Sequence, residues 1–200
     1  MSRGRLIVFE GGEASGKSTQ AGLLAADLGA VLTHEPGGTA AGRRVREVVL
    51  DPAVGELSAR AEALLMAADR AQHVAEVVEP ALARGDDVVS DRFTPSSLAY
   101  QGFGRGLDLD ELRRLSDWAT GGLDPDLVVL LEVPVDVVRR RQGRRPDRME
   151  AEDDAFHSRV AEGYRRLAAA EPGRWVVVDG TGEIDEVAAR VRDAVGALLP

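Results

Sequence analysis

The chain has 200 residues, of which 44% are apolar and 30% charged, and its formal net charge is −9. This length predicts a single domain over 1–200, with enough apolar residues for a buried core. The negative charge argues against a general nucleic-acid surface, and no apolar run approaches the ~18 residues of a membrane span. The absence of cysteine excludes disulfides, thiolate metal sites and a cysteine nucleophile. We expect a cytoplasmic protein that binds neither nucleic acid nor membrane.

Five short apolar segments, rich in β-branched residues or leucine, alternate with helical patterns along the chain. The third and fourth are continuous apolar runs, as expected of strands buried on both faces of a parallel sheet. We therefore predict a three-layer α/β fold with a five-stranded parallel sheet and helices on both faces. The predicted strands are 5–9, 30–33, 87–90, 126–133 and 174–178.

Helical periodicity and end signals predict four helices between and after these strands. The first begins at the lysine of a glycine-rich segment and ends at Gly29, a residue suited to the position after a helix. Ser58 is expected to cap a long helix that Pro80 kinks or divides. The predicted ranges are 17–29, 58–84, 149–170 and about 183–199.

Residues 11–18 read GGEASGKS and fit the G-x-x-x-x-G-K-[ST] pattern of a phosphate-binding loop. A predicted strand precedes the segment and a predicted helix follows it, as the pattern requires. Its glycines let backbone amides turn toward phosphate oxygens, Lys17 reaches the β and γ phosphates, and Ser18 offers a hydroxyl to Mg²⁺. The residues expected to bind ATP are Gly11, Gly12, Glu13, Ala14, Ser15, Gly16, Lys17, Ser18 and Thr19.

Nucleotide binding alone leaves a GTPase, an ATP-driven machine and a small-molecule kinase open. A GTPase needs a guanine-reading N-K-x-D segment, which the sequence lacks. The D-x-x-G match at 179–182 follows the last predicted strand and is interpreted as a turn. The chain is short for a motor ATPase, so a kinase acting on a small acceptor fits best. A non-catalytic ATP-binding regulatory module is the alternative from a different class.

Four further segments carry polar residues in a recognisable order. They lie after predicted strands, in the long helix or next to the arginines of residues 139–148: HEPGGT (34–39), MAADR (66–70), DRFTPSSLAYQG (91–102) and DRME (147–150). With the phosphate loop, they resemble the thymidylate kinases, P-loop enzymes that move the γ-phosphoryl group of ATP to dTMP. The resemblance implies a nucleoside-monophosphate-kinase fold, Mg²⁺, an acceptor-binding region at about 35–105, and a homodimer formed through the long helices. Another nucleoside-monophosphate or deoxynucleoside kinase on the same fold is the nearest alternative.

The resemblance also implies how the acceptor is held. It assigns Arg70 and Arg92 to the acceptor phosphate, whose oxygens a guanidinium can grip bidentately. It assigns Ser97 to the thymine edge and Tyr100 to the sugar, although a core aromatic is the alternative for Tyr100. The residues expected to contact dTMP are Glu13, Glu35, Pro36, Met66, Arg70, Arg92, Ser96, Ser97, Tyr100 and Gln101.

Several acids have expected roles near the phosphates. Asp91 ends a buried strand and is placed to act through Mg²⁺ and its waters, with a salt bridge to Arg92 as the alternative. By resemblance, Glu13 takes a hydrogen bond from the 3′-hydroxyl and lies near Mg²⁺. Glu150 approaches the acceptor or its metal, so the expected metal set is Ser18, Asp91 and Glu150. Glu10 is expected to be structural.

Two positions depart from the family pattern. His34 stands where the family often has arginine, so a positive partner is missing there at neutral pH. Met66 stands where the family usually has an aromatic ring that stacks on thymine. Because methionine is flexible and forgoes ring stacking, we hypothesise weaker dTMP affinity or weaker discrimination against dUMP.

Six arginines occur within residues 139–148, in a predicted lid over about 139–150. In the family that the chain resembles, the arginine that stabilises the transferring phosphoryl group comes either from the phosphate loop or from the lid, and it contributes ~10³–10⁵ in rate. Since Ala14 and Ser15 carry no charge, the resemblance implies that the lid supplies it here. Arg144 and Arg148 are the first choices, ahead of the other lid arginines Arg141 and Arg145; a solvated surface arginine is the alternative for each. The expected catalytic set is Glu13, Lys17, Arg92, Arg144 and Arg148.

Overall fold

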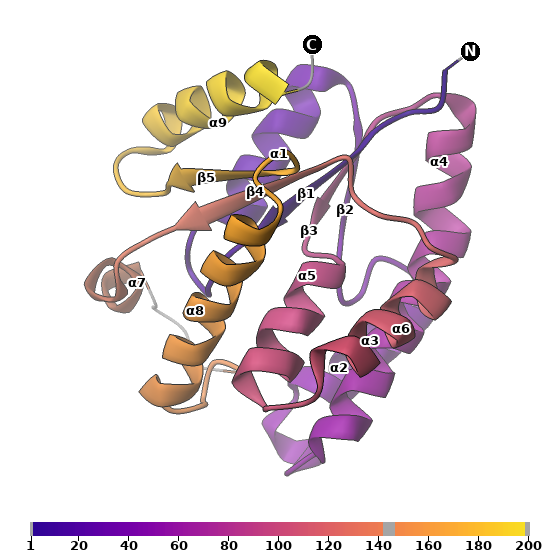
Figure 1. The fold of residues 1–200 in the computed structure, drawn as a ribbon, viewed down its shortest axis with the longest axis vertical. Helices are drawn as coiled ribbons and strands as arrows, with labels where there is room; N and C mark the ends of the chain where they lie inside the picture. Colours follow the sequence, from indigo (N-terminus) through magenta and orange to yellow (C-terminus); the bar gives the residue numbers. More distant parts are fainter. Residues whose placement is uncertain (1, 142–146, 199–200) are drawn as a thin grey trace.

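The computed structural model describes residues 2–141 and 147–198. Five parallel strands form one sheet in the order β2-β3-β1-β4-β5 (Figure 1). This confirms the predicted α/β class and all five strands, each boundary lying within one residue of its expected place. The strands are Leu6–Glu10 (β1), Val31–His34 (β2), Val88–Asp91 (β3), Leu127–Glu132 (β4) and Trp175–Asp179 (β5).

Helices cover both faces of the sheet (Figure 1). Two π-helical segments, Val74–Val78 (η2) and Leu98–Gly104 (η3), and a short 3₁₀ turn, Pro52–Val54 (η1), interrupt the helical regions. The α-helices are Lys17–Leu28 (α1), Ala40–Leu50 (α2), Ala59–His73 (α3), Glu79–Arg84 (α4), Thr94–Ser97 (α5), Leu109–Thr120 (α6), Val135–Arg141 (α7), Asp154–Ala170 (α8) and Ile184–Leu198 (α9).

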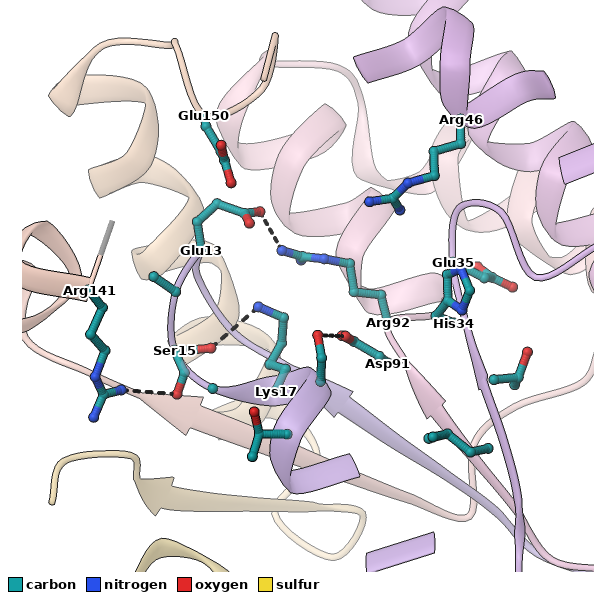
Figure 2. A pocket seen from close by; sticks show the side chains of 16 residues that line it. Glu13, Ser15, Lys17, His34, Glu35, Arg46, Asp91, Arg92, Arg141 and Glu150 are labelled. Atoms are coloured by element: carbon teal, nitrogen blue, oxygen red, sulfur yellow. Dashed lines mark hydrogen bonds and ion pairs between the residues drawn. The ribbon is translucent and has the colours of Figure 1, made fainter. Parts of the chain in front are cut away.

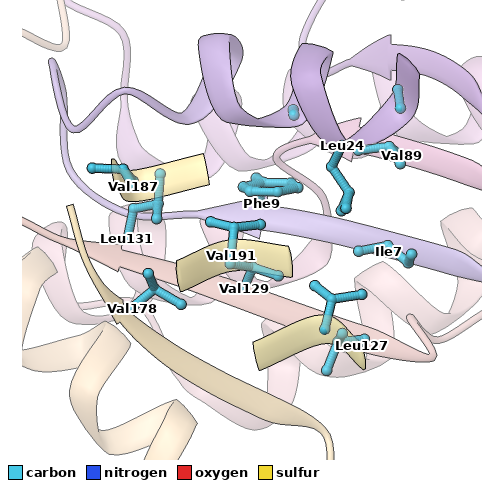
Figure 3. Close-up of a cluster of buried hydrophobic side chains, with 13 residues drawn as sticks. Ile7, Phe9, Leu24, Val89, Leu127, Val129, Leu131, Val178, Val187 and Val191 are labelled. Carbon is cyan, nitrogen blue, oxygen red and sulfur yellow. The ribbon is translucent and has the colours of Figure 1, made fainter. Parts of the chain in front are cut away.

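The central strand β1 is buried on both sides. Ile7 and Phe9 pack with side chains of α1 and α9 in one apolar cluster (Figure 3). Leu6 and Val8 point to the opposite face, where they pack against η2 and α4. Successive side chains of a strand alternate between faces, so a strand covered on both faces must be apolar throughout. This explains the continuous apolar runs of the sequence.

The long helix predicted over 58–84 is divided as expected. Ser58 caps α3, its hydroxyl oxygen accepting the amide of Ala61 at 3.3 Å. The helix then widens into η2 and continues as α4 with Pro80 in its first turn. Because proline has no amide to donate and its ring crowds the preceding turn, the hydrogen-bond pattern changes just before Pro80.

The helix predicted from residue 149 begins later, and that boundary was wrong. Asp153 caps α8 by accepting the amide of Phe156 at 2.6 Å, so the helix starts at Asp154. Met149 lies in the preceding turn yet still packs in the same apolar cluster as Phe156. The spacing of Met149 thus indicates that it packs in the same apolar core as α8, although it does not belong to that helix. Helices α2, α5, α6 and α7 lie outside the four predicted helical ranges.

The sheet brings the site together at one edge. Strands β1, β3 and β4 run parallel, with Phe9 opposite Asp91 and Glu10 opposite Leu130. Their carboxyl ends therefore open toward the same region, where ligands of such sheets bind. Within the described ranges, no helix is both long and apolar enough to cross a membrane.

Candidate active site

A cavity of about 970 Å³ lies at the carboxyl edge of the sheet (Figure 2). The phosphate loop and the start of α1 form one side of it. Its other sides are formed by the ends of β2 and β3, by helix α2, by the end of α7 and by Glu150. Six segments distant in the sequence thus surround one space large enough for phosphorylated ligands.

Glycines allow the phosphate loop to pass closely by β4. Gly16 precedes α1 with φ of 95°, a left-handed conformation that side chains disfavour. Gly11 has φ of 141°, and a Cβ there would lie 2.5 Å from the carbonyl oxygen of Leu131. At these two positions glycine is required by conformation or by space. The loop therefore ends at the amino terminus of α1, where free amides favour an anion.

Lys17 is 6% exposed and folds back over the loop. Its Nζ donates to the carbonyl oxygen of Gly12 at 2.6 Å and to Oγ of Ser15 at 3.3 Å. Burial, with Arg92 nearby, lowers the pKa of Lys17 to about 8, against the opposing pull of Glu13. Both acceptors are neutral, so an anion entering the loop can compete for this ammonium group.

Ser18 and Asp91 meet across the start of the cavity, Ser18 Oγ donating to Oδ2 of Asp91 (Figure 2). The other oxygen, Oδ1 of Asp91, is buried and has no hydrogen-bond partner among the residues that the structure describes. Among the described residues, Arg92 forms its ion pair with Glu13 and not with Asp91. A hydroxyl beside a carboxylate with an unused oxygen fits Mg²⁺, which uses few protein ligands and completes its shell with phosphates and water.

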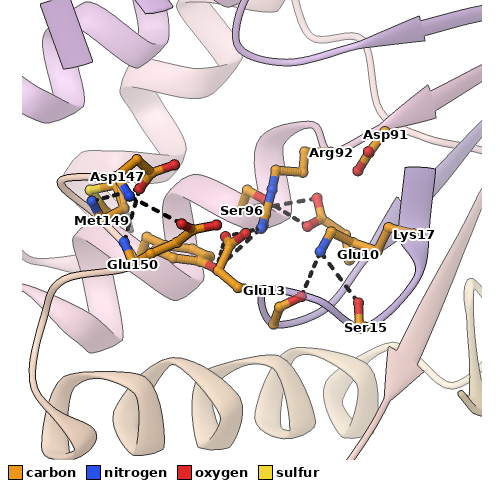
Figure 4. Close-up of polar contacts among 12 residues, drawn as sticks. Glu10, Glu13, Ser15, Lys17, Asp91, Arg92, Ser96, Asp147, Met149 and Glu150 are labelled. Atoms are coloured by element: carbon orange, nitrogen blue, oxygen red, sulfur yellow. Dashed lines mark hydrogen bonds and ion pairs between the residues drawn. The ribbon is translucent and has the colours of Figure 1, made fainter. Parts of the chain in front are cut away.

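Arg92 occupies the centre of a polar network (Figure 4). Its Nη2 donates to Oε1 of Glu13 and to the hydroxyl of Tyr100 at 3.2 Å. Its backbone φ of 74° is unusual for a residue with a side chain, and such strain persists only where contacts hold it. Although burial opposes ionisation, Arg92 and Lys17 hold the pKa of Glu13 at about 2. The pair is therefore charged at neutral pH.

Behind Arg92 lies a second, fully buried acid, Glu10. Its Oε1 accepts the amides of Phe93 and Ser96 at 3.0 and 3.1 Å. Its Oε2 accepts the hydroxyls of Ser96 and Tyr164 at 2.6 and 2.8 Å, and Tyr164 also accepts from Arg92 at 3.1 Å. Glu10 therefore meets backbone groups, as expected of a structural acid, and it supports the turn that presents Arg92. Tyr164 was not singled out from the sequence.

A third network joins Glu35 to α3. Oε2 of Glu35 accepts Nε of Arg70 at 2.8 Å, and Oε1 lies 2.8 Å from Nδ1 of the buried His73. The remaining donors of Arg70 reach Oγ of Ser97 at 3.1 Å and the carbonyl oxygen of Phe93 at 3.0 Å. Neither Arg70 nor Ser97 lines either of the two described cavities. Their assigned contacts with dTMP stay predictions.

Arg46 is a site residue that sequence reasoning missed. It extends from α2 toward Arg92 (Figure 2), donates to the carbonyl oxygen of Pro36 at 2.9 Å, and lines both cavities. Burial and Arg46 lower the pKa of His34, so the ring is neutral at pH 7, as expected. Arg46 therefore brings a positive charge from α2 close to His34. No motif marks Arg46, and only the placement of α2 reveals it.

A smaller cavity of about 90 Å³ adjoins the first. Glu13, Glu35, Arg46 and Arg92 belong to both cavities, which makes the two a continuous region. Eight of the ten predicted acceptor residues line this cavity: Glu13, Glu35, Pro36, Met66, Arg92, Ser96, Tyr100 and Gln101. Sequence reasoning missed the contributions of Val49, Leu50 and Met149.

The lid arginines separate by location. Arg144 and Arg145 lie outside the described residues. Arg148 is held by two protein acceptors, its Nη2 donating to Oε2 of Glu62 at 2.6 Å and its Nε to the carbonyl oxygen of Val49 at 2.7 Å. Arg141 lines the large cavity and donates to the carbonyl oxygen of Ser15 at 3.5 Å (Figure 2). It also donates to the carbonyl oxygen of Gly180 at 3.1 Å.

Comparison with known proteins places the chain among related sequences. A family model described as thymidylate kinase matches residues 9–191. Thymidylate kinases from Leifsonia xyli subsp. xyli and Deinococcus radiodurans are 51% and 50% identical, covering 94% and 98% of this chain and 93% and 98% of their own lengths. A crystal structure of thymidylate kinase from Ehrlichia chaffeensis is similar with a TM-score of 0.81 at 30% identity, covering 96% of this chain and 99% of its own. The chain belongs to the thymidylate kinase family.

Proposed function

We propose that the protein phosphorylates dTMP to dTDP with ATP, by in-line transfer of the γ-phosphoryl group to the 5′-phosphate. The observation that carries this proposal is the convergence of Lys17, Arg46 and Arg92 on one cavity beside the phosphate loop. Two phosphorylated ligands that meet end to end need such cations between them, because their oxygens repel each other and charge spreads over the transferring group. No general base is required, since the attacking phosphate oxygen is already anionic.

ATP is proposed to lie over the phosphate loop, with its β and γ phosphates at Lys17. The acceptor phosphate is proposed to lie at Arg92 and Arg46. These two arginines reach the cavity from β3 and α2, so they can hold the acceptor from two sides. Glu13 pairs with Arg92 and is ionised, which supports its proposed role as the acceptor of the 3′-hydroxyl hydrogen bond.

The thymine base is proposed to enter the smaller cavity, beside Met66, Tyr100 and Gln101. Tyr100 is 6% exposed and its hydroxyl donates to Glu13 at 3.0 Å. Its ring is therefore proposed to form part of the wall of the smaller cavity. Oε1 of Gln101 is buried without a hydrogen-bond partner among the described residues. An acceptor in that state suits a base that carries an N–H group.

Ser18 and Asp91 are the residues proposed to hold Mg²⁺. When bound, the ion neutralises charge on the β and γ phosphates. Glu150 lines the same cavity from the segment after the lid, and its Oε2 accepts the amide of Asp147 at 3.1 Å. Its proposed part in metal or acceptor binding rests on that position.

The catalytic lid arginine is proposed to be Arg144 or Arg141. Arg141 is supported by its place in the large cavity, where it donates to the carbonyl oxygens of Ser15 and Gly180. Arg148, a first choice from the sequence, has less support because two protein acceptors hold its guanidinium.

The test is the formation of dTDP from dTMP and MgATP, with dUMP, UMP, CMP and AMP assayed in parallel. A preference for another acceptor would favour a different nucleoside-monophosphate kinase, and ATP binding without any product would favour a regulatory module. Arg92→Ala separates the acceptor assignment from the reaction itself. If kcat/KM for dTMP stayed normal in that variant, Arg92 would not hold the acceptor phosphate.

Two further expectations stay predictions. The homodimer is expected through the long helices, and equilibrium sedimentation of the purified protein measures it. The cytoplasmic location is testable by fractionation of the cells that produce the protein.

A further inference from the structure

Glu62 is a buried acid that the proposed mechanism does not use. It lies on α3, is 0% exposed, and its two oxygens accept four hydrogen bonds. Oε1 accepts Nε2 of Gln101 at 2.9 Å and Nε of Arg105 at 3.2 Å. Oε2 accepts Nη2 of Arg105 at 3.1 Å and Nη2 of Arg148 at 2.6 Å. Every lone-pair position of the carboxylate is therefore filled.

The two arginines keep Glu62 ionised. Burial works against the charged form, but the hydrogen bonds from Arg105, Gln101 and Arg148 outweigh it and lower the pKa of the carboxyl. An ionised carboxylate has acceptors and no donor. The amide of Gln101 must then turn its NH₂ group toward Glu62, which leaves Oε1 on the other side.

Gln101 lines the smaller cavity and is 2% exposed, and its Oε1 has no hydrogen-bond partner within the described part of the chain. We infer that Glu62 is a positioning residue for base recognition: it fixes the Gln101 amide so that the cavity presents an acceptor rather than a donor. Thymine offers N3–H to that acceptor. Cytosine, whose N3 is itself an acceptor, is disfavoured by the same orientation.

The inference predicts the effect of removing the charge of Glu62 without changing its shape. In Glu62→Gln, the carbonyl oxygen is expected at the Oε2 position, which accepts from both arginines, because the NH₂ group at the Oε1 position then meets one arginine donor, Nε of Arg105, instead of two. The new NH₂ group then faces Gln101, whose amide turns over and presents its own NH₂ to the base. The NH₂ group of Gln101 and the N3–H of thymine would then both be donors and would form no hydrogen bond. The N3 atom of cytosine would instead accept a hydrogen bond from that NH₂ group.

The experiment measures the dissociation constants of dTMP and dCMP by calorimetry for the wild type and Glu62→Gln. We expect the preference for dTMP over dCMP to fall about tenfold or more, because a mispaired buried polar group costs at least that ratio. Glu47→Gln is the matched control, since Glu47 is an exposed carboxylate that pairs with Arg44. An equal loss of affinity for both nucleotides in Glu62→Gln would overturn the inference.

The inference rests on the proposed contact of Gln101 with the base, and Gln101→Met tests that contact separately. If Gln101→Met leaves the dTMP/dCMP preference unchanged, the contact itself is wrong. If it lowers the preference while Glu62→Gln does not, only the role of Glu62 is lost. In the double variant, we expect no additional loss of preference from the change at Glu62.

A measurement on the wild type covers the case in which Glu62→Gln does not fold. The side-chain NH₂ resonances of Gln101, identified by their loss in Gln101→Met, are expected to exchange slowly with water with and without dTMP, because they donate to a buried acid. Protection that arises only after dTMP is added would show that the NH₂ group faces the base, and would overturn the inference.

Discussion

The buried ammonium group of Lys17 predicts a pH dependence of ATP affinity. Its pKa is lowered to about 8, so in the free protein Lys17 loses its proton as pH rises through that value. It is then about nine-tenths protonated at pH 7 and about one-tenth at pH 9. If only the cation attracts the phosphates, affinity for ATP should fall roughly tenfold between these pH values, which corresponds to about 1.4 kcal/mol.

Calorimetric titration with ATP at constant excess MgCl₂ and ionic strength, at pH 7, 8 and 9, measures this change. Above pH 8 binding should also take up close to one proton, which shows as a dependence of the apparent enthalpy on the buffer. Lys17→Arg is the control: its guanidinium stays protonated throughout, so its affinity should not follow the same curve. Equal wild-type affinity at pH 7 and pH 9, without proton uptake, would refute the reasoning.

Three further predictions concern stability, base binding and the lid arginine. Burial raises the pKa of Asp69 to about 6, so the carboxylate destabilises the fold as pH rises through about 4 to 6. Asp69→Asn should gain up to about 3 kcal/mol of unfolding free energy relative to the wild type between pH 4 and pH 7, measured by urea denaturation; a constant difference would contradict it. Met66→Phe should lower the KM for dTMP several-fold and strengthen the preference over dUMP through ring stacking, and unchanged values would reject that hypothesis. Arg148→Met should lower the melting temperature by several degrees while kcat stays within about tenfold, because the side chain serves buried Glu62. A loss near 10³ in kcat with an unchanged melting temperature would instead support a catalytic Arg148.

The sequence alone determined the fold class, the strands and the phosphate loop. Continuous apolar runs that alternate with helical patterns indicate strands covered on both faces, and a glycine-rich turn between strand and helix leaves few alternatives to phosphate binding. Ser58 and Pro80 acted locally, through a cap and a missing amide, so their effects were predictable from neighbouring residues. The resemblance of the motifs to those of a known family then predicted dTMP as the phosphoryl acceptor.

The tertiary structure decided which charges meet. Arg46 carries no local signal, because its place in the cavity depends on how α2 packs over the sheet. Arg148 lies in the predicted lid, yet its guanidinium is turned to Glu62, a residue 86 positions away. Glu62 itself resembled any polar residue of a helix. Hydrogen bonds between distant segments depend on packing geometry, which periodicity and spacing do not encode, so the acid that orients Gln101 was visible only in the fold.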